Sequence, residues 1–292
     1  VHCAHCLNRS EVPWVVDFEA YWSFSVSGSI SNSSIGKYLI KKYLSNDSCK
    51  KILPWVPSVK DEFEKIIKDK NILDKVEVLY PGFPMPQYKR KKKDNITLLF
   101  IGRYFFQKGG QAAVRAFDKL TKKYDNVDAI VIADTPESWV QKYSENKKIK
   151  FYDLMPQDKL YKDIYPNCDI FVYPGFSDSF GFGFVEAMSF GLSIVTVDGV
   201  NRKDVVTDGK TGFIVPRVGG INYVSLEKNP YYDAPEVEVL VNNLVEKTAV
   251  LIENIVLRNN FSKNAVKEID GGRFSLEKRN KHLNRIYSEA LK

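Results

Sequence analysis

The sequence predicts an α/β protein in which parallel strands alternate with helices. Two observations support this fold class. Between residues 96 and 215, short β-branched runs alternate with segments of helical periodicity, a pattern typical of βαβ units with helices on both faces of a sheet. The hydrophobic fraction of 44% and the charged fraction of 27% are ordinary for a globular protein, which excludes the disordered, collagen-like and coiled-coil classes.

Two domains are expected, because 292 residues exceed the usual size of one. A stretch rich in proline and lysine at residues 83–94 is the best linker candidate. We therefore expect a first domain over residues 1–88, a second over 89–272 and a closing helix over 273–292. No run of 18 apolar residues occurs, and no basic leader precedes an apolar core at the start, so neither a membrane-spanning helix nor a secretory signal is expected.

The first domain is expected to contain strands at residues 13–18, 51–55 and 76–79, a basic amphipathic helix at 33–44 and a helix at 59–69. Its start, with His2, Cys3, His5 and Cys6, resembles a set of metal ligands. Structural zinc sites pair two such groups at a distance, and the chain has no second CxxC motif. We favour a buried strand here and expect no metal.

The second domain is expected to contain strands at residues 96–102, 127–133, 148–152, 168–173, 192–197 and 212–215. The helices between and after them are expected at 109–124, 137–143, 157–164, 183–190, 236–256 and 274–291. Residues 217–235 form an irregular insert. Ligands of open parallel sheets bind at the carboxyl ends of the strands, so the loops there are the candidate site.

The net charge of +7 suits an acidic partner, either a phosphorylated small molecule, an anionic membrane surface or nucleic acid. Part of the excess lies in the run from Lys89 to Lys93, which we interpret as a solvated surface loop. The four cysteines are expected to be reduced thiols of a cytoplasmic protein.

The loop GRYFFQKGG after the strand at 96–102 places Arg103 and Lys108 at a strand end. Two cations there suit a diphosphate, because arginine can grip it with two hydrogen bonds and lysine acts as a point charge. The alternative is a pair of ordinary surface cations.

The loop YPGFSDSFGFGFVEAM after the strand at 168–173 is rich in glycine and leads into a helix. Free backbone N–H groups at such a helix start bind anions. Asp178 and Glu186 cannot bind phosphate, but their oxygens can accept hydrogen bonds from sugar hydroxyls. The two loops together therefore fit a sugar diphosphate. Taken alone, Asp178 is as readily a helix cap and Glu186 a solvated helix residue.

Two common phosphate motifs are missing from the sequence. No GxGxxG follows a strand, and DGKT at residues 208–211 has Asp204 where a Walker A loop needs its first glycine. A dinucleotide-dependent enzyme and a P-loop nucleotidase are both disfavoured.

These motifs resemble the retaining GT-B glycosyltransferases that use nucleotide-sugar donors, a large glycogen-synthase-like and mannosyltransferase-like family also called glycosyl transferases group 1. GRYFFQKG resembles its G-R-x-x-x-x-K-G motif, PGFSDSFGFGFVEAMSFG its P-S-x-x-E-x-F-G-x-x-x-x-E-A-M-x-x-G motif, and DGKTGFIVP a later glycine segment. FSLEKRNKHLNRIY resembles the family's last helix, which crosses back to the first domain. The resemblance covers about residues 50–290 and implies two Rossmann-like domains with parallel sheets facing a cleft.

The resemblance also implies roles for individual residues. Arg103 and Lys108 would bind the donor diphosphate, Glu186 the ribose hydroxyls and Asp178 the transferred sugar. Further donor contacts are expected from the loop and helix start, at Ser179, Phe180, Gly181, Phe182 and Gly183. The loops at Asp134–Ser138 and Tyr152–Pro156, the second of which includes Asp153 and Leu154, are expected to line the base. Glu19 stands where many members have a histidine facing the cleft, and a strand-end carboxylate without a catalytic role is the alternative.

The sequence departs from the family pattern in three places. Asp178 replaces the usual glutamate, which is longer by one methylene, or roughly 1.5 Å. Gly175 replaces the usual serine. The first domain is short and has no glycine-rich loop before residue 27, so we expect it to be incomplete at its N-terminal side, which leaves the activity of this stretch of chain open.

The resemblance implies a hexosyltransferase-type enzyme that transfers a sugar from a nucleotide-diphosphate donor to an acceptor hydroxyl, with retention and without a metal or other cofactor. The acceptor is a glycan, a lipid-linked molecule or a small molecule. The alternative is a non-catalytic or degenerate nucleotide-sugar-binding subunit. We expect no nucleic-acid partner, and an anionic membrane surface remains a candidate partner through the basic helix, with the protein peripheral at the inner membrane surface.

Overall fold

The computed structural model describes residues 1–25, 28–91, 93–175, 178, 180–221 and 235–292. The chain divides into two compact units. The first unit comprises Val1–Phe83 and Gly271–Lys292, and the second unit comprises Pro84–Asp270. The predicted boundary after residue 88 lies in the irregular segment with which the second unit begins.

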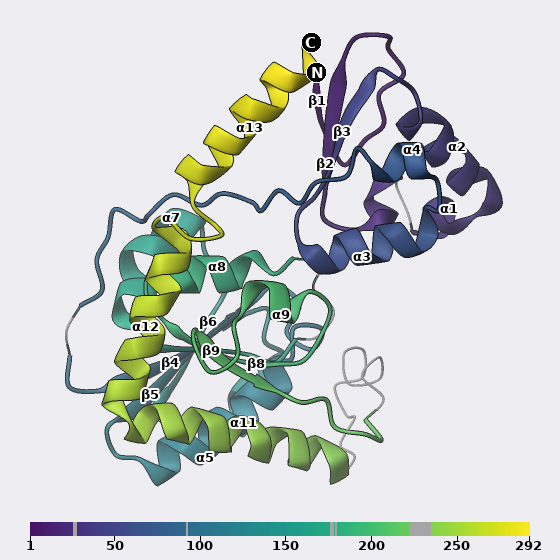
Figure 1. The fold of residues 1–292 in the computed structure, drawn as a ribbon. Helices are drawn as coiled ribbons and strands as arrows, with labels where there is room; N and C mark the ends of the chain where they lie inside the picture. The colour runs from purple at the N-terminus through teal and green to yellow at the C-terminus, as the bar shows by residue number, and fades with distance from the viewer. Residues whose placement is uncertain (26–27, 92, 176–177, 179, 222–234) are drawn as a thin grey trace. The chain divides into compact units, whose positions relative to one another are not determined.

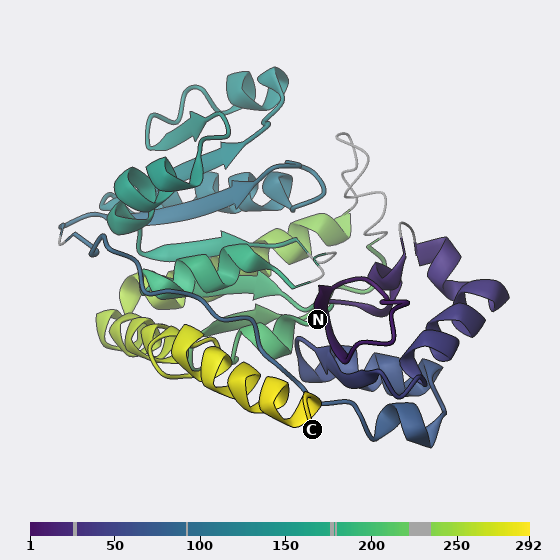
Figure 2. The same cartoon turned by 90° about the horizontal axis from the view of Figure 1, so that it is seen from above.

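The first unit is built on a parallel sheet of order β1-β2-β3, with β1 at His2–Ala4, β2 at Trp14–Phe18 and β3 at Cys49–Pro54. The favoured strand at the start of the chain is therefore present, and Cys3 in it is buried. The helices of this unit are α1 (Gly28–Asn32), α2 (Ser34–Leu44), α3 (Pro57–Ile66), α4 (Lys70–Leu73) and α13 (Leu276–Ala290), with a 3-10 turn at Tyr21–Phe24. Both chain termini lie in this unit (Figure 2).

The prediction of a strand at residues 76–79 is wrong. This segment runs beside β3 but forms only a single bridge with it. Val76 makes a single parallel bridge to Ile52, and the N–H of Leu79 donates to the carbonyl of Pro54 at 3.0 Å. Pro54 has no N–H with which to return a hydrogen bond, so the ladder is interrupted there.

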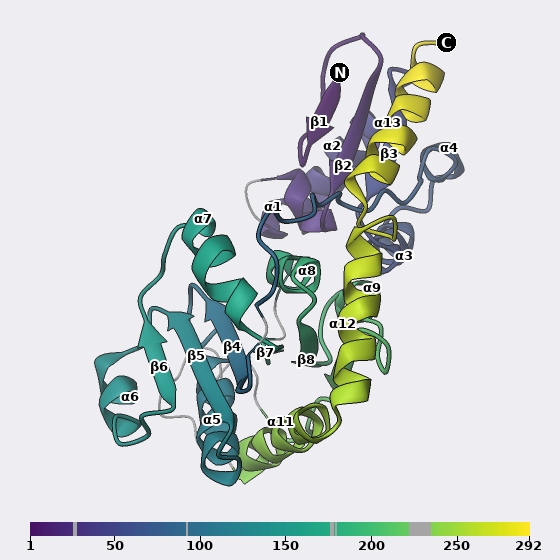
Figure 3. The ribbon, with the colours of Figure 1, turned by 90° about the vertical axis from the view of Figure 1, so that its left-hand side faces the viewer.

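Helix α13 packs in the first unit, where it lies beside the small sheet (Figures 1 and 3). Its apolar residues Leu283, Ile286 and Ala290 share a buried cluster with three residues of the same unit, namely Val15 of β2, Leu53 of β3 and Leu79. Polar contacts add to this packing. Arg279 Nη2 lies 2.9 Å from Asp17 Oδ2, and His282 Nε2 lies 2.6 Å from Glu77 Oε1.

The second unit contains a six-stranded parallel sheet of order β6-β5-β4-β7-β8-β9, and Figure 3 shows the strands from β6 to β8 in this order. Its strands are β4 (Ile96–Gly102), β5 (Val127–Ala133), β6 (Ile149–Tyr152), β7 (Ile170–Tyr173), β8 (Ser193–Val197) and β9 (Gly212–Val215). The chain winds outward from β4 to β6 and then returns to β7 on the other side of β4. The predicted parallel α/β class is confirmed, and β4 and β7 flank the point at which the winding reverses.

The helices of the second unit are α5 (Gly110–Lys123), α6 (Glu137–Lys142), α7 (Gln157–Lys159), α8 (Phe182–Ser189), α9 (Arg202–Val205), α11 (Pro235–Glu253) and α12 (Ile255–Ile269). A π-helical turn, Leu160–Ile164, continues α7. Helix α11 packs against α5, and α12 packs against α8. The predicted helix at 236–256 ends early, because Asn254 caps a separate helix, α12, by accepting a hydrogen bond from the N–H of Leu257. Most of the predicted insert at 217–235 lies outside the described residues.

The basic run at residues 89–93 is not simply a solvated loop, which corrects the interpretation made from the sequence. Arg90 forms an ion pair with Asp169, and Lys93 Nζ lies 3.6 Å from the other oxygen of that carboxylate. Asp169 is 8% exposed and also accepts a hydrogen bond from the N–H of Thr97 at 2.8 Å. A buried carboxylate needs compensating charge, so these two cations hold the segment onto the sheet.

Two features are absent from the described residues. None of the helices there has both the length and the hydrophobicity of a membrane-spanning helix. No three of the His, Cys, Asp and Glu side chains in that part of the chain lie close enough together to hold a metal ion.

Candidate donor-binding site

The loops that follow β4 and β7 meet at the point where the winding of the sheet reverses. Lys108 of the first loop forms an ion pair with Asp178 of the second, and the exposed fractions of these side chains are only 21% and 12%. The backbones also touch. A Cβ atom at Gly109 would fall 2.8 Å from the carbonyl carbon of Pro174, and one at Gly175 would fall 2.9 Å from the carbonyl oxygen of Lys108. Glycine is therefore required where the two loops cross.

The loop after β4 presents one exposed cation and one half-buried cation. Arg103 is exposed immediately after the strand, whereas Lys108 lies against Asp178. Between them Phe105 is buried, and its backbone N–H donates to Asp134 Oδ1 at 2.8 Å. Gly109 then adopts a left-handed conformation, with φ of 80°, and starts α5. The sequence thus forms a short, anchored loop that keeps both predicted phosphate-binding cations at the strand end.

The loop after β7 leads into α8 through Gly181, whose φ of 85° is left-handed. Phe180 is buried, while Phe182 at the helix start is 45% exposed and Gly183 is partly exposed. Ser179, predicted to contact the donor, lies outside the described residues. Asp178 does not cap α8: one of its oxygens pairs with Lys108, and the other is buried without a hydrogen-bond partner among the described residues.

Glu186 is held from behind by three donors from the segment that includes α7. Gln157 Nε2 and the Tyr161 hydroxyl donate to Oε1 at 2.7 and 3.3 Å, and the Tyr165 hydroxyl donates to Oε2 at 3.0 Å. Burial, and then the charge of Glu186, raise the pKa of both tyrosine hydroxyls, so these hydroxyls stay protonated as donors. Glu186 is therefore a fixed acceptor rather than a solvated helix residue. A carboxylate has about four lone-pair positions, so one remains for a ligand hydroxyl.

The loop after β6 contributes no fixed side chain at its tip. Asp153 and Leu154 follow the strand directly, and both are exposed. Asp134, which directly follows β5, accepts a hydrogen bond from the loop after β4 with one of its carboxylate oxygens. The predicted base-lining loops thus lie at the same edge of the sheet as the cations, because all six strands are parallel and their carboxyl ends share one edge.

Arg202, at the start of α9, belongs to this site and was missed by the sequence interpretation. It is 1% exposed, and its guanidinium lies over the ring of Phe184 at 4.3 Å. Its Nη2 donates to the carbonyl of Gly175 in the loop after β7. Burial lowers the pKa of Arg202, and the negative charge of Asp178 opposes this shift. The local sequence NRKD is that of an exposed turn, so no sequence signal pointed to a buried arginine.

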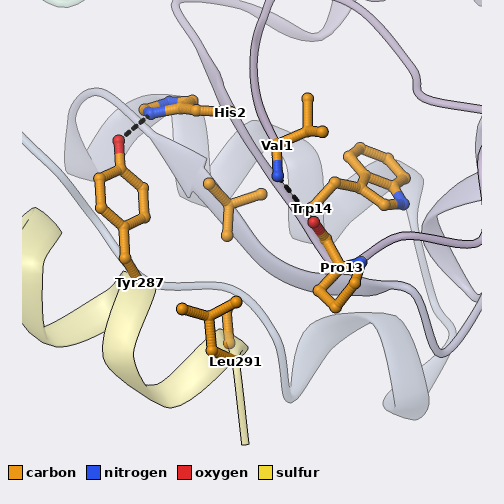
Figure 4. Close-up of a pocket in the computed structure, with 8 residues that line it drawn as sticks. Val1, His2, Pro13, Trp14, Tyr287 and Leu291 are labelled. Atoms are coloured by element: carbon orange, nitrogen blue, oxygen red, sulfur yellow. Dashed lines mark hydrogen bonds between the residues drawn. The ribbon is translucent and has the colours of Figure 1, made fainter.

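Glu19 lies in the first unit, directly after β2, and is partly exposed. The structure thus places it at the carboxyl end of a strand, as expected, whereas the donor loops belong to the second unit. A separate pocket of about 310 Å³ in the first unit is lined by both chain ends, including Val1, His2, Tyr287 and Leu291 (Figure 4). There His2 Nδ1 lies 2.5 Å from the Tyr287 hydroxyl.

Known proteins resemble this chain in sequence and in fold. Residues 85–219 match the family model described as Glycosyl transferases group 1. The phosphatidylinositol N-acetylglucosaminyltransferase GPI3 subunit of Saccharomyces cerevisiae (strain YJM789) is 30% identical over 122 residues, which are 40% of this chain and 27% of the relative. The chain spans between about a quarter and a little over half of the length of the curated relatives it matches.

The fold is that of solved GT-B glycosyltransferases. Sucrose-phosphate synthase from Thermosynechococcus elongatus superposes with a TM-score of 0.67 at 14% identity, over 95% of this chain and 68% of that one. The Anabaena protein Alr3699/HepE, solved in complex with UDP and glucose, superposes with a TM-score of 0.65 at 17% identity, over 94% of this chain and 71% of that one. The expected GT-B fold is confirmed.

Proposed function

We propose that the protein, whose residues 85–219 match the family model of glycosyl transferases group 1, transfers a hexose from a nucleotide-diphosphate sugar to an acceptor hydroxyl. The observation that carries the proposal is the ion pair of Lys108 and Asp178 at the reversal point of the sheet, together with a fixed Glu186 on α8, the helix into which the loop of Asp178 leads. In this proposal Lys108 is the phosphate-binding cation, and Asp178 and Glu186 are the sugar-binding carboxylates at the same edge of the sheet.

In the proposed reaction, each of these groups acts on a different part of the donor. Glu186 accepts hydrogen bonds from the ribose hydroxyls. Arg103, Lys108 and the positive end of the α8 helix dipole neutralise the charge that develops on the departing diphosphate, and such preorganised groups are the usual large contribution to catalysis. Lysine has three donor hydrogens, so Lys108 can contact phosphate and Asp178 together. Asp178 then accepts a hydrogen bond from the transferred sugar.

We propose that the anomeric configuration is retained and that these cations, rather than a metal ion, carry the charge neutralisation. Both points rest on the family relationship. The structurally similar Anabaena protein is described with UDP and glucose, so UDP and UDP-glucose are the first ligands to test here. GDP, ADP and CMP, with GDP-mannose, complete the panel.

Thermal unfolding with this panel tests the proposal. A ligand at 100 times its dissociation constant stabilises by about 2.7 kcal/mol, which corresponds to a rise in Tm of roughly 5–10 °C for a unit of this size. We expect one diphosphate to give this rise and the Arg103→Ala and Lys108→Ala variants to lose most of it. Lys267→Ala, which removes an exposed lysine of α12, is the matched control and should keep it. A well-folded protein that no nucleotide stabilises would refute the proposal.

Turnover separates the enzyme from a non-catalytic nucleotide-sugar-binding subunit, the second candidate function. The aspartate in place of the family's longer glutamate favours this second candidate. Release of nucleoside diphosphate from the bound donor, in the presence of acceptor mixtures and insensitive to EDTA, supports transfer. Binding without any release supports the subunit.

We also propose that the protein is cytoplasmic and docks on anionic lipid through α2. This helix exposes Ile35 (74%) and Tyr38 (62%) next to Lys37, Lys41 and Lys42, an apolar and basic combination typical of interfacial helices. The cysteines of the chain are all free, which suits a reducing compartment.

Flotation with vesicles tests the docking proposal. Each lysine near an anionic surface contributes about 1 kcal/mol, so replacing the three lysines of α2 by glutamate should reduce binding to phosphatidylglycerol vesicles by more than tenfold. The same charge change at Lys65, Lys68 and Lys70, which are exposed elsewhere in the first unit, should have a smaller effect. Equal losses for the two triple variants would contradict docking through α2.

A further inference from the structure

Arg202 is a buried cation whose hydrogen bonds go to uncharged groups. Its Nε donates to the carbonyl of Val197 at 3.3 Å, its Nη2 donates to the carbonyl of Gly175, and its plane covers the ring of Phe184. Its Nη1 is buried and has no hydrogen-bond partner among the described residues. A buried charge without a nearby opposite charge is unfavourable, so the structure requires an anion close to this guanidinium.

Asp178 is the best candidate for that anion. Its side chain is 12% exposed, and its Oδ2 is a second buried atom without a hydrogen-bond partner in the described part of the chain. Asp198 also interacts electrostatically with Arg202, but it is more exposed, at 35%, and lies 3.0 Å from Lys203. Nη1 of Arg202 also lies beside the turn that follows Asp178, 3.4 Å from the position that a Cβ atom at Gly181 would take.

Asp178 thus interacts with two cations of different character, with Lys108 through an ion pair and with Arg202 electrostatically. Lys108 is on the loop after β4, is partly exposed, and pairs with Oδ1. Arg202 is fully buried and is bound to the backbone of Asp178's own loop at Gly175. An incoming diphosphate would share Lys108 with Asp178, but it would not contact a guanidinium that is covered by protein atoms.

Resting on the function proposed above, we propose that Arg202 is a positioning residue that keeps Asp178 ionised and in place for the transferred sugar while Lys108 serves the diphosphate. The two cations would thus have different roles. Lys108 would contact both Asp178 and the donor diphosphate, whereas Arg202 would interact with protein groups alone. Arg202 would then affect recognition of the sugar through Asp178, and have little effect on the nucleotide diphosphate.

The test is a double-mutant cycle read out as a ratio of affinities. Dissociation constants for a nucleoside diphosphate and for its sugar conjugate, UDP and UDP-glucose first, are measured by calorimetry for the wild type, Arg202→Lys, Arg202→Gln, Asp178→Asn and the Arg202→Lys/Asp178→Asn double variant. Coupled groups in contact typically interact by an amount worth several-fold to a hundredfold in affinity. We expect Arg202→Lys to weaken the sugar conjugate about tenfold and the diphosphate less than threefold. Arg202→Gln, which also loses the charge, should weaken the conjugate further.

In the Asp178→Asn background, Arg202→Lys should leave the ratio unchanged, because the residue through which it acts has lost its charge. Arg258→Lys is the matched control, since Arg258 is a second buried arginine of the second unit, 8% exposed, which donates to the carbonyls of Leu251 and Ile252. That variant should lower the Tm without altering the ratio.

Three results would overturn the inference. The first is an equal loss of affinity for diphosphate and conjugate in Arg202→Lys, which a merely structural role predicts. The second is the same change of ratio in the Asp178→Asn background. The third is an unchanged ratio in both Arg202 variants. A wild type that binds neither ligand would instead refute the proposed function, and the inference would fall with it. If Arg202→Gln does not fold, Arg202→Lys decides alone.

Discussion

Replacing Tyr165 with phenylalanine removes a single hydroxyl group from behind Glu186. Tyr165 is completely buried, and its hydroxyl donates to Glu186 Oε2 at 3.0 Å. The ring itself would stay in place, because it stacks on Phe190 with the planes only 7° apart and the centroids 5.0 Å apart. The change therefore isolates one hydrogen bond to a charged acceptor.

The magnitude follows from that bond. A hydrogen bond to a charged group contributes about 1.5–3 kcal/mol, and no packing is lost. A loss of about 2 kcal/mol in the free energy of unfolding corresponds to a fall in Tm of roughly 4–8 °C. Glu186 would also be held by only two donors, so we expect affinity for UDP to fall about three- to tenfold, which is roughly 1 kcal/mol.

Urea or thermal unfolding and UDP titration of Tyr165→Phe check this expectation. Tyr161→Phe is the matched control, because its hydroxyl lies 3.3 Å from Glu186 Oε1 and the residue is partly exposed, so water can replace it. Its effects should be smaller. Pyrophosphate, which has no ribose, should bind both variants like the wild type. If Tyr165→Phe unfolds and binds UDP like the wild type, the reasoning that Glu186 is a fixed ribose acceptor is refuted.

Two further predictions concern buried carboxylates outside the site. Asp169→Asn leaves Arg90 without its charge partner, so we expect the free energy of unfolding in urea to fall by about 3–5 kcal/mol. The control Lys89→Ala changes an exposed lysine of the same run and should lower it by less than about 0.5 kcal/mol. Similar values for the two variants would show that the basic segment is not held by Asp169. Burial by itself raises the pKa of Asp17, but His2 and Arg279 lower it by more, so the net pKa is below its ordinary value. The stability that Asp17 contributes is therefore fully present above about pH 4–5 and is lost as the pH falls further. The difference in unfolding free energy between the wild type and Asp17→Asn should therefore shrink from pH 7 to pH 3. A difference that stays constant over this range would contradict the linkage.

Much of the sheet was predictable because buried parallel strands are continuous apolar runs. The strands predicted at 96–102, 127–133 and 212–215 have the observed bounds. Arg103 and Lys108 were also placed correctly at a strand end, because the chain must leave a parallel strand at the edge where ligands bind. Their spacing did not reveal that Lys108 pairs with Asp178, since that contact joins loops 70 residues apart in the chain.

What the sequence did not predict depends on tertiary contacts. Helix α12 was missed because α11 and α12 are separated by a single residue, Asn254, whose capping role was not recognised. Arg90 and Arg202 both stand in polar, basic stretches typical of exposed loops, yet each meets a partner that is remote in sequence, Asp169 and Gly175 respectively. Burial of an arginine is decided by such partners, which local composition does not contain.

The crossing of the two backbones at Gly109 and Gly175 fixes the spacing between the side chains that would bind the donor. The distance between the group that would hold the diphosphate and the group that would hold the sugar is determined by main-chain atoms, which leave no room even for a methyl group. A change of donor preference, whether in evolution or by design, cannot come from widening this crossing without displacing Lys108 and Asp178 together. A change of donor preference must instead come from exposed residues of the surrounding loops, such as Asp153 and Leu154 after β6, which can vary while the crossing stays constant.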